Sequence, residues 1–201
     1  MKRIYWIMAA LAFVLLTAGT MVLRWQQGPG APEARPQPAD IAHAAVEGDL
    51  FNHYLIEAPK KAVQAETFQA VPINGGPPGL AGFQGRYLLL NFWATWCEPC
   101  KVEMPELQAL HEGLKDRNVA VVAISMQEEP DKVRKFLATT PYTFHVYADP
   151  EGKVAELYGV TSIPLTYLIR PDGRIEGRAL GLRTWNDKAL RDHFVKEAAQ
   201  R

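Results

Sequence analysis

Residues 91–105 read "NFWATWCEPCKVEMP" and contain the only two cysteines of the 201-residue chain, Cys97 and Cys100. The overlapping stretch "YLLLNFWA", residues 87–94, is a nearly continuous apolar run, as is typical of a strand covered on both faces. Leucines at helical spacing follow the cysteines. The pattern therefore places the two cysteines where a buried strand ends and a helix begins.

This position favours redox chemistry. The unpaired amides and the positive dipole end of a helix stabilise a thiolate at Cys97. Pro99 suits the first helical turn, where its missing N–H is not needed. Cys100 lies one turn further on the same side and can close a disulfide with Cys97. We predict that Cys97 is the exposed, attacking sulfur and that Cys100 is the more buried, resolving one.

Three other uses of the pair fit the sequence less well. A structural disulfide closing so short a loop would stabilise the fold little, because stabilisation grows with loop length. Structural zinc needs four ligands, and the chain has no second cysteine pair, while its five histidines are scattered. Inert packing does not fit a strand-to-helix junction. We therefore predict a redox-active disulfide with no cofactor and no metal; copper binding by the two cysteines is the alternative.

Strand and helix patterns alternate from about Thr67 onward, and "RPDG" supplies turn chemistry between the last two strands. A further hairpin is possible around "INGGPPG", and Thr184 is the candidate cap of the last helix. Parallel strands joined by helices and finished by an antiparallel hairpin predict an α/β sandwich. The predicted order is strand 87–94, helix 98–117, strand 119–126, helix 129–140, strand 143–149, helix 151–160, strand 164–169, strand 174–180 and a helix after 184.

The N-terminus has the pattern of a targeting segment. Lys2 and Arg3 precede residues 4–23, which carry no charge. As a helix these residues would span about 30 Å, the thickness of the bilayer core. We predict an uncleaved membrane anchor at residues 1–24 with its basic end in the cytoplasm, and a cleaved signal peptide as the alternative.

The remainder divides into a spacer and a folded domain. Residues 25–45 are rich in proline, which favours extended chain, and predict a linker. A folded α/β domain is predicted for residues 46–201. The net charge of the chain is zero, and its basic N-terminus leaves a mildly acidic body, which argues against nucleic-acid binding.

The stretch 91–105, together with "YGVTSIPLTYLI" at residues 158–169, resembles the thioredoxin superfamily. It is similar in particular to the membrane-tethered thioredoxin-like reductases of the TlpA/ResA/CcmG group, over roughly residues 67–195. The resemblance implies a three-layer sandwich, with a central mixed sheet flanked by helices. It also implies a cis bond before Pro164 opposite Cys97, and a backbone at Ile163 that pairs with client strands.

Other residues near the cysteines gain roles from the same resemblance. Trp96 is expected as an exposed aromatic beside the attacking sulfur. Glu103, on the helical face of Cys100, corresponds to a glutamate near the dithiol of similar reductases, which implies a proton acceptor for Cys100; a solvated surface acid is the alternative. Cytoplasmic thioredoxins have a buried aspartate where this chain has Asn91, so that role is absent or belongs to Glu103. Glu98 opposes thiolate formation at Cys97.

The expected activity is reduction of client disulfides. No histidine or lysine lies between the cysteines to stabilise the thiolate, which favours a reducing couple. The resemblance implies clients in cytochrome c maturation (apocytochrome c) or in copper-site assembly for cytochrome oxidase. It also implies an electron donor of the CcdA/DsbD type and a domain on the periplasmic side of the bacterial inner membrane. A disulfide oxidant or isomerase, or a copper-binding assembly protein, is the alternative.

Overall fold

The computed structural model describes residues 49–140 and 142–200. The predicted anchor (1–24) and the predicted linker (25–45) lie outside these described residues. Within them, no helix is both long enough and apolar enough to cross a membrane.

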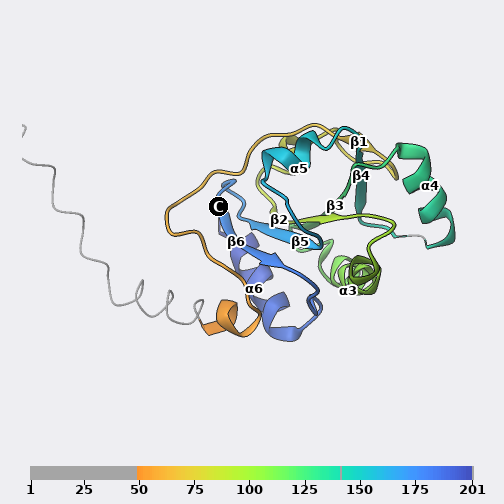
Figure 1. The fold of residues 1–201 in the computed structure, drawn as a ribbon. Coiled ribbons are helices and arrows are strands. Elements are labelled where there is room, and N and C mark those ends of the chain that lie inside the picture. The colour runs from red at the N-terminus through yellow and green to blue at the C-terminus, as the bar shows by residue number, and fades with distance from the viewer. Residues whose placement is uncertain (1–48, 141, 201) are drawn as a thin grey trace, which may run out of the picture. The chain divides into compact units, whose positions relative to one another are not determined.

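A mixed six-stranded sheet forms the centre of the fold, in the order β1-β4-β3-β2-β5-β6 (Figure 1). Strands β2, β3 and β4 run parallel, whereas β1 and β5 pair antiparallel with their neighbours and β6 pairs antiparallel with β5. The strands are β1 (Val71–Pro72), β2 (Tyr87–Trp93), β3 (Val119–Met126), β4 (His145–Asp149), β5 (Leu165–Ile169) and β6 (Ile175–Leu180).

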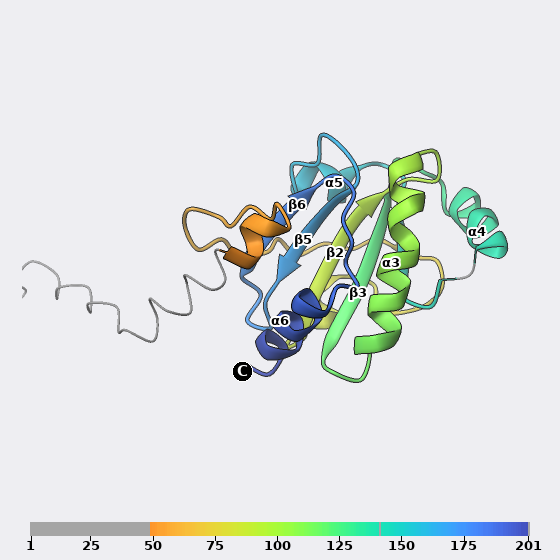
Figure 2. The same cartoon turned by 90° about the horizontal axis from the view of Figure 1, so that it is seen from below.

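Helices cover both faces of this sheet, which confirms the predicted α/β sandwich. Side chains of α3, α4 and α6 join one hydrophobic core, and Figure 2 shows α3 and α6 lying across that face. Side chains of α5 and of the 3-10 helix η1 join a second core on the opposite face. The helices are η1 (Leu80–Phe83), α3 (Glu98–Leu114), α4 (Pro130–Thr139), α5 (Lys153–Leu157) and α6 (Lys188–Ala198). A further short helical segment covers residues 49–53.

The apolar run of β2 follows from its central place in the sheet. All seven residues are buried. Leu89 and Trp93 point into the core beneath α3, whereas Leu88 and Phe92 point into the opposite core. Since side chains alternate between the two faces of a strand, both sets must be apolar when both faces are covered.

Two local predictions need correction. The last helix begins at Lys188 with Asp187 as its cap, whose carboxylate accepts the N–H of Ala189 at 2.8 Å; Thr184 is not the cap. The chain before Asp187 is held against α3 by hydrogen bonds from Arg183 and Trp185 to Glu103, so the helix begins only after these residues.

The predicted hairpin around residues 73–79 is only partly formed. An isolated bridge between Gln69 and Gly79 closes the loop, but β1 pairs with β4. A Cβ atom at position 79 would lie 2.0 Å from the carbonyl oxygen of Phe68, so this close approach requires glycine.

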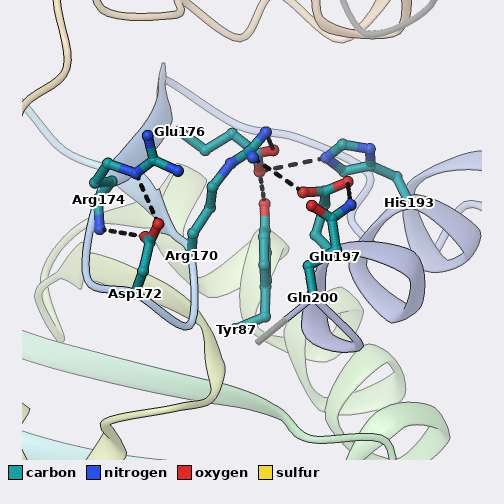
Figure 3. Close-up of polar contacts among 8 residues, drawn as sticks. All are labelled: Tyr87, Arg170, Asp172, Arg174, Glu176, His193, Glu197 and Gln200. Carbon is teal, nitrogen blue, oxygen red and sulfur yellow. Dashed lines mark hydrogen bonds and ion pairs between the residues drawn. The ribbon is translucent and has the colours of Figure 1, made fainter. Parts of the chain in front are cut away.

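A buried cluster of charged groups lies at the end of the sheet opposite the cysteines, where β2 begins (Figure 3). Glu176 accepts hydrogen bonds from the hydroxyl of Tyr87 and from Nη2 of Arg170, the latter at 2.8 Å. The Nε2 atom of His193 lies 3.3 Å from the Glu176 carboxylate, and Arg170 also pairs with Glu197 at 3.3 Å. The cluster joins β2, β6 and α6 through hydrogen bonds and ion pairs.

Candidate active site

Cys97 and Cys100 form a disulfide at the start of α3. Cys97 is the N-cap residue, with extended backbone (φ −87°, ψ 104°), and its Sγ accepts the N–H of Cys100 at 3.3 Å. Pro99 occupies the first turn. The sulfur of Cys97 therefore lies at the positive end of the helix dipole and accepts an amide of the first turn, in agreement with the prediction from the sequence.

The exposure of the two sulfurs differs from the prediction. Cys97 is only 5% exposed and Cys100 1%, so the prediction of an exposed Cys97 is wrong for this oxidised state. Cys97 is bonded to a sulfur on the buried face of α3 and packs in the same core as Trp93. Of the pair it keeps the greater exposed fraction, and the neighbouring Trp96 is 62% exposed.

The peptide bond between Ile163 and Pro164 is cis, which confirms that prediction. Leu165 pairs with Phe92 across β5 and β2, so Pro164 lies at the end of the sheet from which the chain turns towards Cys97. Ile163 is half-buried and contacts both hydrophobic cores. The sheet register thus brings the two motifs of the sequence to the same end of the molecule.

Glu103 is 1% exposed, so the alternative of a solvated surface acid is wrong. Its Oε1 accepts the indole N–H of Trp185 at 2.8 Å and the backbone N–H of Arg183 at 3.0 Å. Its Oε2 accepts the side-chain amide of Asn91 at 3.0 Å. Burial raises the pKa of Glu103 to about 7, against the opposing effect of these hydrogen bonds.

Replacing Glu103 with glutamine is expected to flatten the pH dependence of stability. The carboxyl group binds its proton more tightly in the folded protein (pKa about 7) than in the unfolded chain (4.5). The stability that this raised pKa contributes to the folded protein is therefore fully present below pH 4.5 and is lost as the pH rises through 7. This loss amounts to about 3 kcal/mol, which glutamine would not show. Urea unfolding of oxidised wild type and variant across this pH range measures the difference.

Glu112→Gln, on an exposed position of the same helix, is the matched control for this titration. A stability difference between wild type and Glu103→Gln that stays constant across the pH range would contradict an elevated pKa at Glu103.

A second buried carboxylate, Glu128, was not singled out from the sequence. It accepts the backbone N–H and the hydroxyl of Thr95 at 2.7 and 2.6 Å, and the hydroxyl of Ser125 at 2.6 Å. Lys132 pairs with it at 2.7 Å. Burial acts to raise the pKa of Glu128, but these hydrogen bonds lower it below the ordinary value.

The two acids therefore have different roles. Glu128 stays ionised and holds Thr95, two residues before Cys97, whereas Glu103 titrates near neutral pH. In the sequence, Glu128 stands just before a predicted helix, where acidic residues are common because they interact favourably with the helix dipole. Its position therefore gave no reason to expect a role near the cysteines. The contacts of Arg183 and Trp185 were also missed, since they lie 80 and 82 residues from Glu103.

Glu98, between the cysteines, is mostly exposed and pairs with Lys101 at 2.5 Å. This lysine partly offsets the negative charge that was expected to oppose a thiolate at Cys97. Within residues 49–140 and 142–200, no group of three or more histidine, cysteine or acidic side chains could hold a metal ion.

Comparisons with known proteins agree with this geometry. Residues 62–178 match the family model of the AhpC/TSA family. The chain is 41% identical over 105 residues to the thiol-disulfide oxidoreductase ResA of Oceanobacillus iheyensis, covering 52% of this chain and 55% of that protein. It is 31% identical over 146 residues to the ResA protein of Bacillus cereus, covering 72% and 84%.

Solved structures extend the comparison to the fold. A structure described as the thiol:disulfide interchange protein DsbE of Chlorobium tepidum superposes with a TM-score of 0.63 at 29% identity, covering 70% of this chain and 99% of that one. StoA of Bacillus subtilis gives a TM-score of 0.56 at 27% identity, covering 66% and 98%.

Proposed function

The chain belongs to the AhpC/TSA family of thioredoxin-like proteins and is a thiol-disulfide oxidoreductase, and on this premise we propose that it works as a reductase of client disulfides. The observation that carries the proposal is the buried Glu103, one helical turn after Cys100, with a pKa of about 7. A carboxylate with this proton affinity is matched to accept a thiol proton near neutral pH.

The reaction has two exchange steps. The Cys97 thiolate attacks one sulfur of a client disulfide, and the other client sulfur leaves as a thiolate, which gives a mixed disulfide. Cys100 then loses its proton to Glu103 and attacks Sγ of Cys97. The client departs with both sulfurs reduced, and the two electrons it has gained leave a Cys97–Cys100 disulfide in the enzyme. The cis bond at Pro164 and the exposed Trp96 supply the face on which we expect the client to dock, with the backbone of Ile163 pairing to its strand.

The direction of electron flow depends on how well the thiolate of Cys97 is stabilised. A strong oxidant needs extra stabilisation of this anion. Here Glu-Pro separates the cysteines, and Lys101, which follows them, is paired with Glu98. This environment supports a reducing couple.

The reduction potential tests this direction. Equilibration of the purified chain with glutathione and dithiothreitol buffers is expected to give a potential nearer to about −270 mV than to about −120 mV. A potential near the upper value would instead support a disulfide oxidant.

The cellular setting is part of the same proposal. The uncharged run at residues 4–23 after two basic residues supports a single-pass anchor in the bacterial inner membrane, with the catalytic domain in the periplasm. An oxidising compartment would keep the dithiol as a disulfide, so a reductase there needs a supply of electrons. We assign this supply to a membrane dithiol carrier of the CcdA/DsbD type, and the clients to apocytochrome c or copper-site assembly factors.

A further inference from the structure

Two of the three donors to Glu103 come from one loop. The loop between β6 and α6 carries Arg183 and Trp185, and both donate to Oε1 of Glu103, at 3.0 and 2.8 Å. Trp185 is fully buried. The third donor, Asn91, lies in β2 and reaches the other oxygen. Donors to a carboxylate favour its charged form, and more strongly inside a protein than in water. The position of this loop therefore bears directly on when Glu103 holds a proton.

The side chain of Arg183 fastens the loop. Its guanidinium donates to the carbonyl oxygens of Leu180 and Leu182, both at 2.8 Å, at the loop's own start. It also donates to those of Tyr54 at 2.8 Å and Leu55 at 3.3 Å. Residues 54–55 follow the first described helical segment and lie 128–129 residues earlier in the chain. One side chain thus joins the beginning of the domain to the loop that touches Glu103.

We propose that Arg183 and Trp185 are positioning residues that set the proton affinity of Glu103, and that segment 54–55 helps to hold Arg183 in place. This inference rests on the proposed role of Glu103 as the proton acceptor for Cys100. With both donors engaged, the pKa of Glu103 is about 7, so an ionised fraction is present at neutral pH and can take the thiol proton. With the loop displaced, the buried carboxyl keeps its proton and cannot accept another. Both residues act through their hydrogen bonds to Glu103.

The direct test is the titration of Glu103 in the oxidised, full-length chain. The ¹³C chemical shift of its side-chain carboxyl, assigned by its loss in Glu103→Gln, gives the midpoint. Trp185→Phe removes one hydrogen bond to a charged group, so the midpoint should rise by about one to two pH units. Arg183→Met loosens the loop but keeps the backbone N–H, and should give a smaller rise.

Arg178→Gln is the matched control. Arg178 forms an exposed ion pair with Glu57, also between β6 and the beginning of the domain. In the part of the chain that the structure describes, it forms no hydrogen bond or ion pair with Glu103. Its removal should leave the midpoint of Glu103 unchanged. If Trp185→Phe does not fold, Arg183→Met carries the test, since this side chain is only half-buried. An unchanged midpoint in the folded variants would overturn the inference.

A kinetic measurement separates this inference from the proposed function. The chain is loaded with glutathione on Cys97, and release of glutathione by Cys100 is followed against pH. We expect Trp185→Phe to raise the pH at which the release rate is half-maximal. In Glu103→Gln, the dependence of the release rate on the titration of this carboxyl should be lost. One combination of results separates the two. If Trp185→Phe shifts the titration midpoint of Glu103 but Glu103→Gln leaves the pH profile of glutathione release unchanged, the proton-acceptor role is refuted, whereas the positioning of Glu103 by the loop stands.

Discussion

Replacing Cys100 with serine is expected to turn the enzyme into a trap for its clients. Cys97 can still attack a client disulfide, but the resolving sulfur is gone, so the mixed disulfide persists. An attacking group held in place has an effective concentration far above that of any free thiol, and release should slow by at least about 10³-fold. Expression of Cys100→Ser in native membranes, followed by non-reducing electrophoresis, should show covalent adducts that a thiol reductant removes.

Cys97→Ser is the control for the trap. If Cys97 is the attacking sulfur, this variant should form no adducts, although it keeps one cysteine in the same helical turn. Adducts on Cys97→Ser alone would reverse the roles of the two sulfurs, and the lack of adducts on both variants would contradict client reduction. Mass spectrometry of the trapped partners would identify the clients and test the assignment to apocytochrome c or copper-site assembly factors.

Replacing Glu176 with alanine is expected to produce the largest loss of stability among the charged groups of the domain. Glu176 is buried and accepts hydrogen bonds from Tyr87 and Arg170, with His193 beside it (Figure 3). Removing Glu176 leaves Arg170 with Glu197 as its acidic partner and takes the acceptor from the buried hydroxyl of Tyr87. Breaking a buried ion pair in this way costs about 3–5 kcal/mol. Urea unfolding at pH 7 measures the change.

The neighbouring turn offers a matched control. Arg174 and Asp172 form an ion pair about half exposed, also drawn in Figure 3, and Arg174→Gln should cost less than about 1 kcal/mol. Equal losses from Glu176→Ala and Arg174→Gln would contradict a stabilising role for the buried cluster. The dithiol lies at the end of β2 opposite this cluster. Under conditions in which Glu176→Ala is folded, the reduction potential of its dithiol should therefore equal that of wild type.

The pH dependence of this cluster is opposite to that of Glu103. Burial acts to raise the pKa of Glu176, but His193, Tyr87 and Arg170 together lower it below its ordinary value. A carboxyl group with a lowered folded pKa contributes stability above the unfolded value of 4.5, and loses it as the pH falls through the folded pKa. Glu103, with its raised pKa, loses its contribution as the pH rises.

Local patterns predicted most of the fold. Strand β3 has the bounds expected from its apolar run, and β2 ends one residue earlier than expected. The cysteine pair lies at the predicted strand-to-helix junction, and the cis bond lies before Pro164. The hairpin expected around residues 73–79 is only partly formed, and the predictions that failed were the cap at Thr184 and the exposure of Cys97. In both cases a contact with a distant or buried group outweighs the local preference of the residue.

The amino-acid sequence by itself determined the order of strands and helices and the place of the dithiol, because periodicity, capping and turn preferences act over a few residues. Only the tertiary structure decided the environment of the acids: Glu103 receives donors from residues 80 and 82 positions away, and Glu128 holds Thr95 from 33 positions away. The pKa of a buried carboxyl depends on these partners and on its loss of water. The register of the sheet and the packing of the helices bring both about.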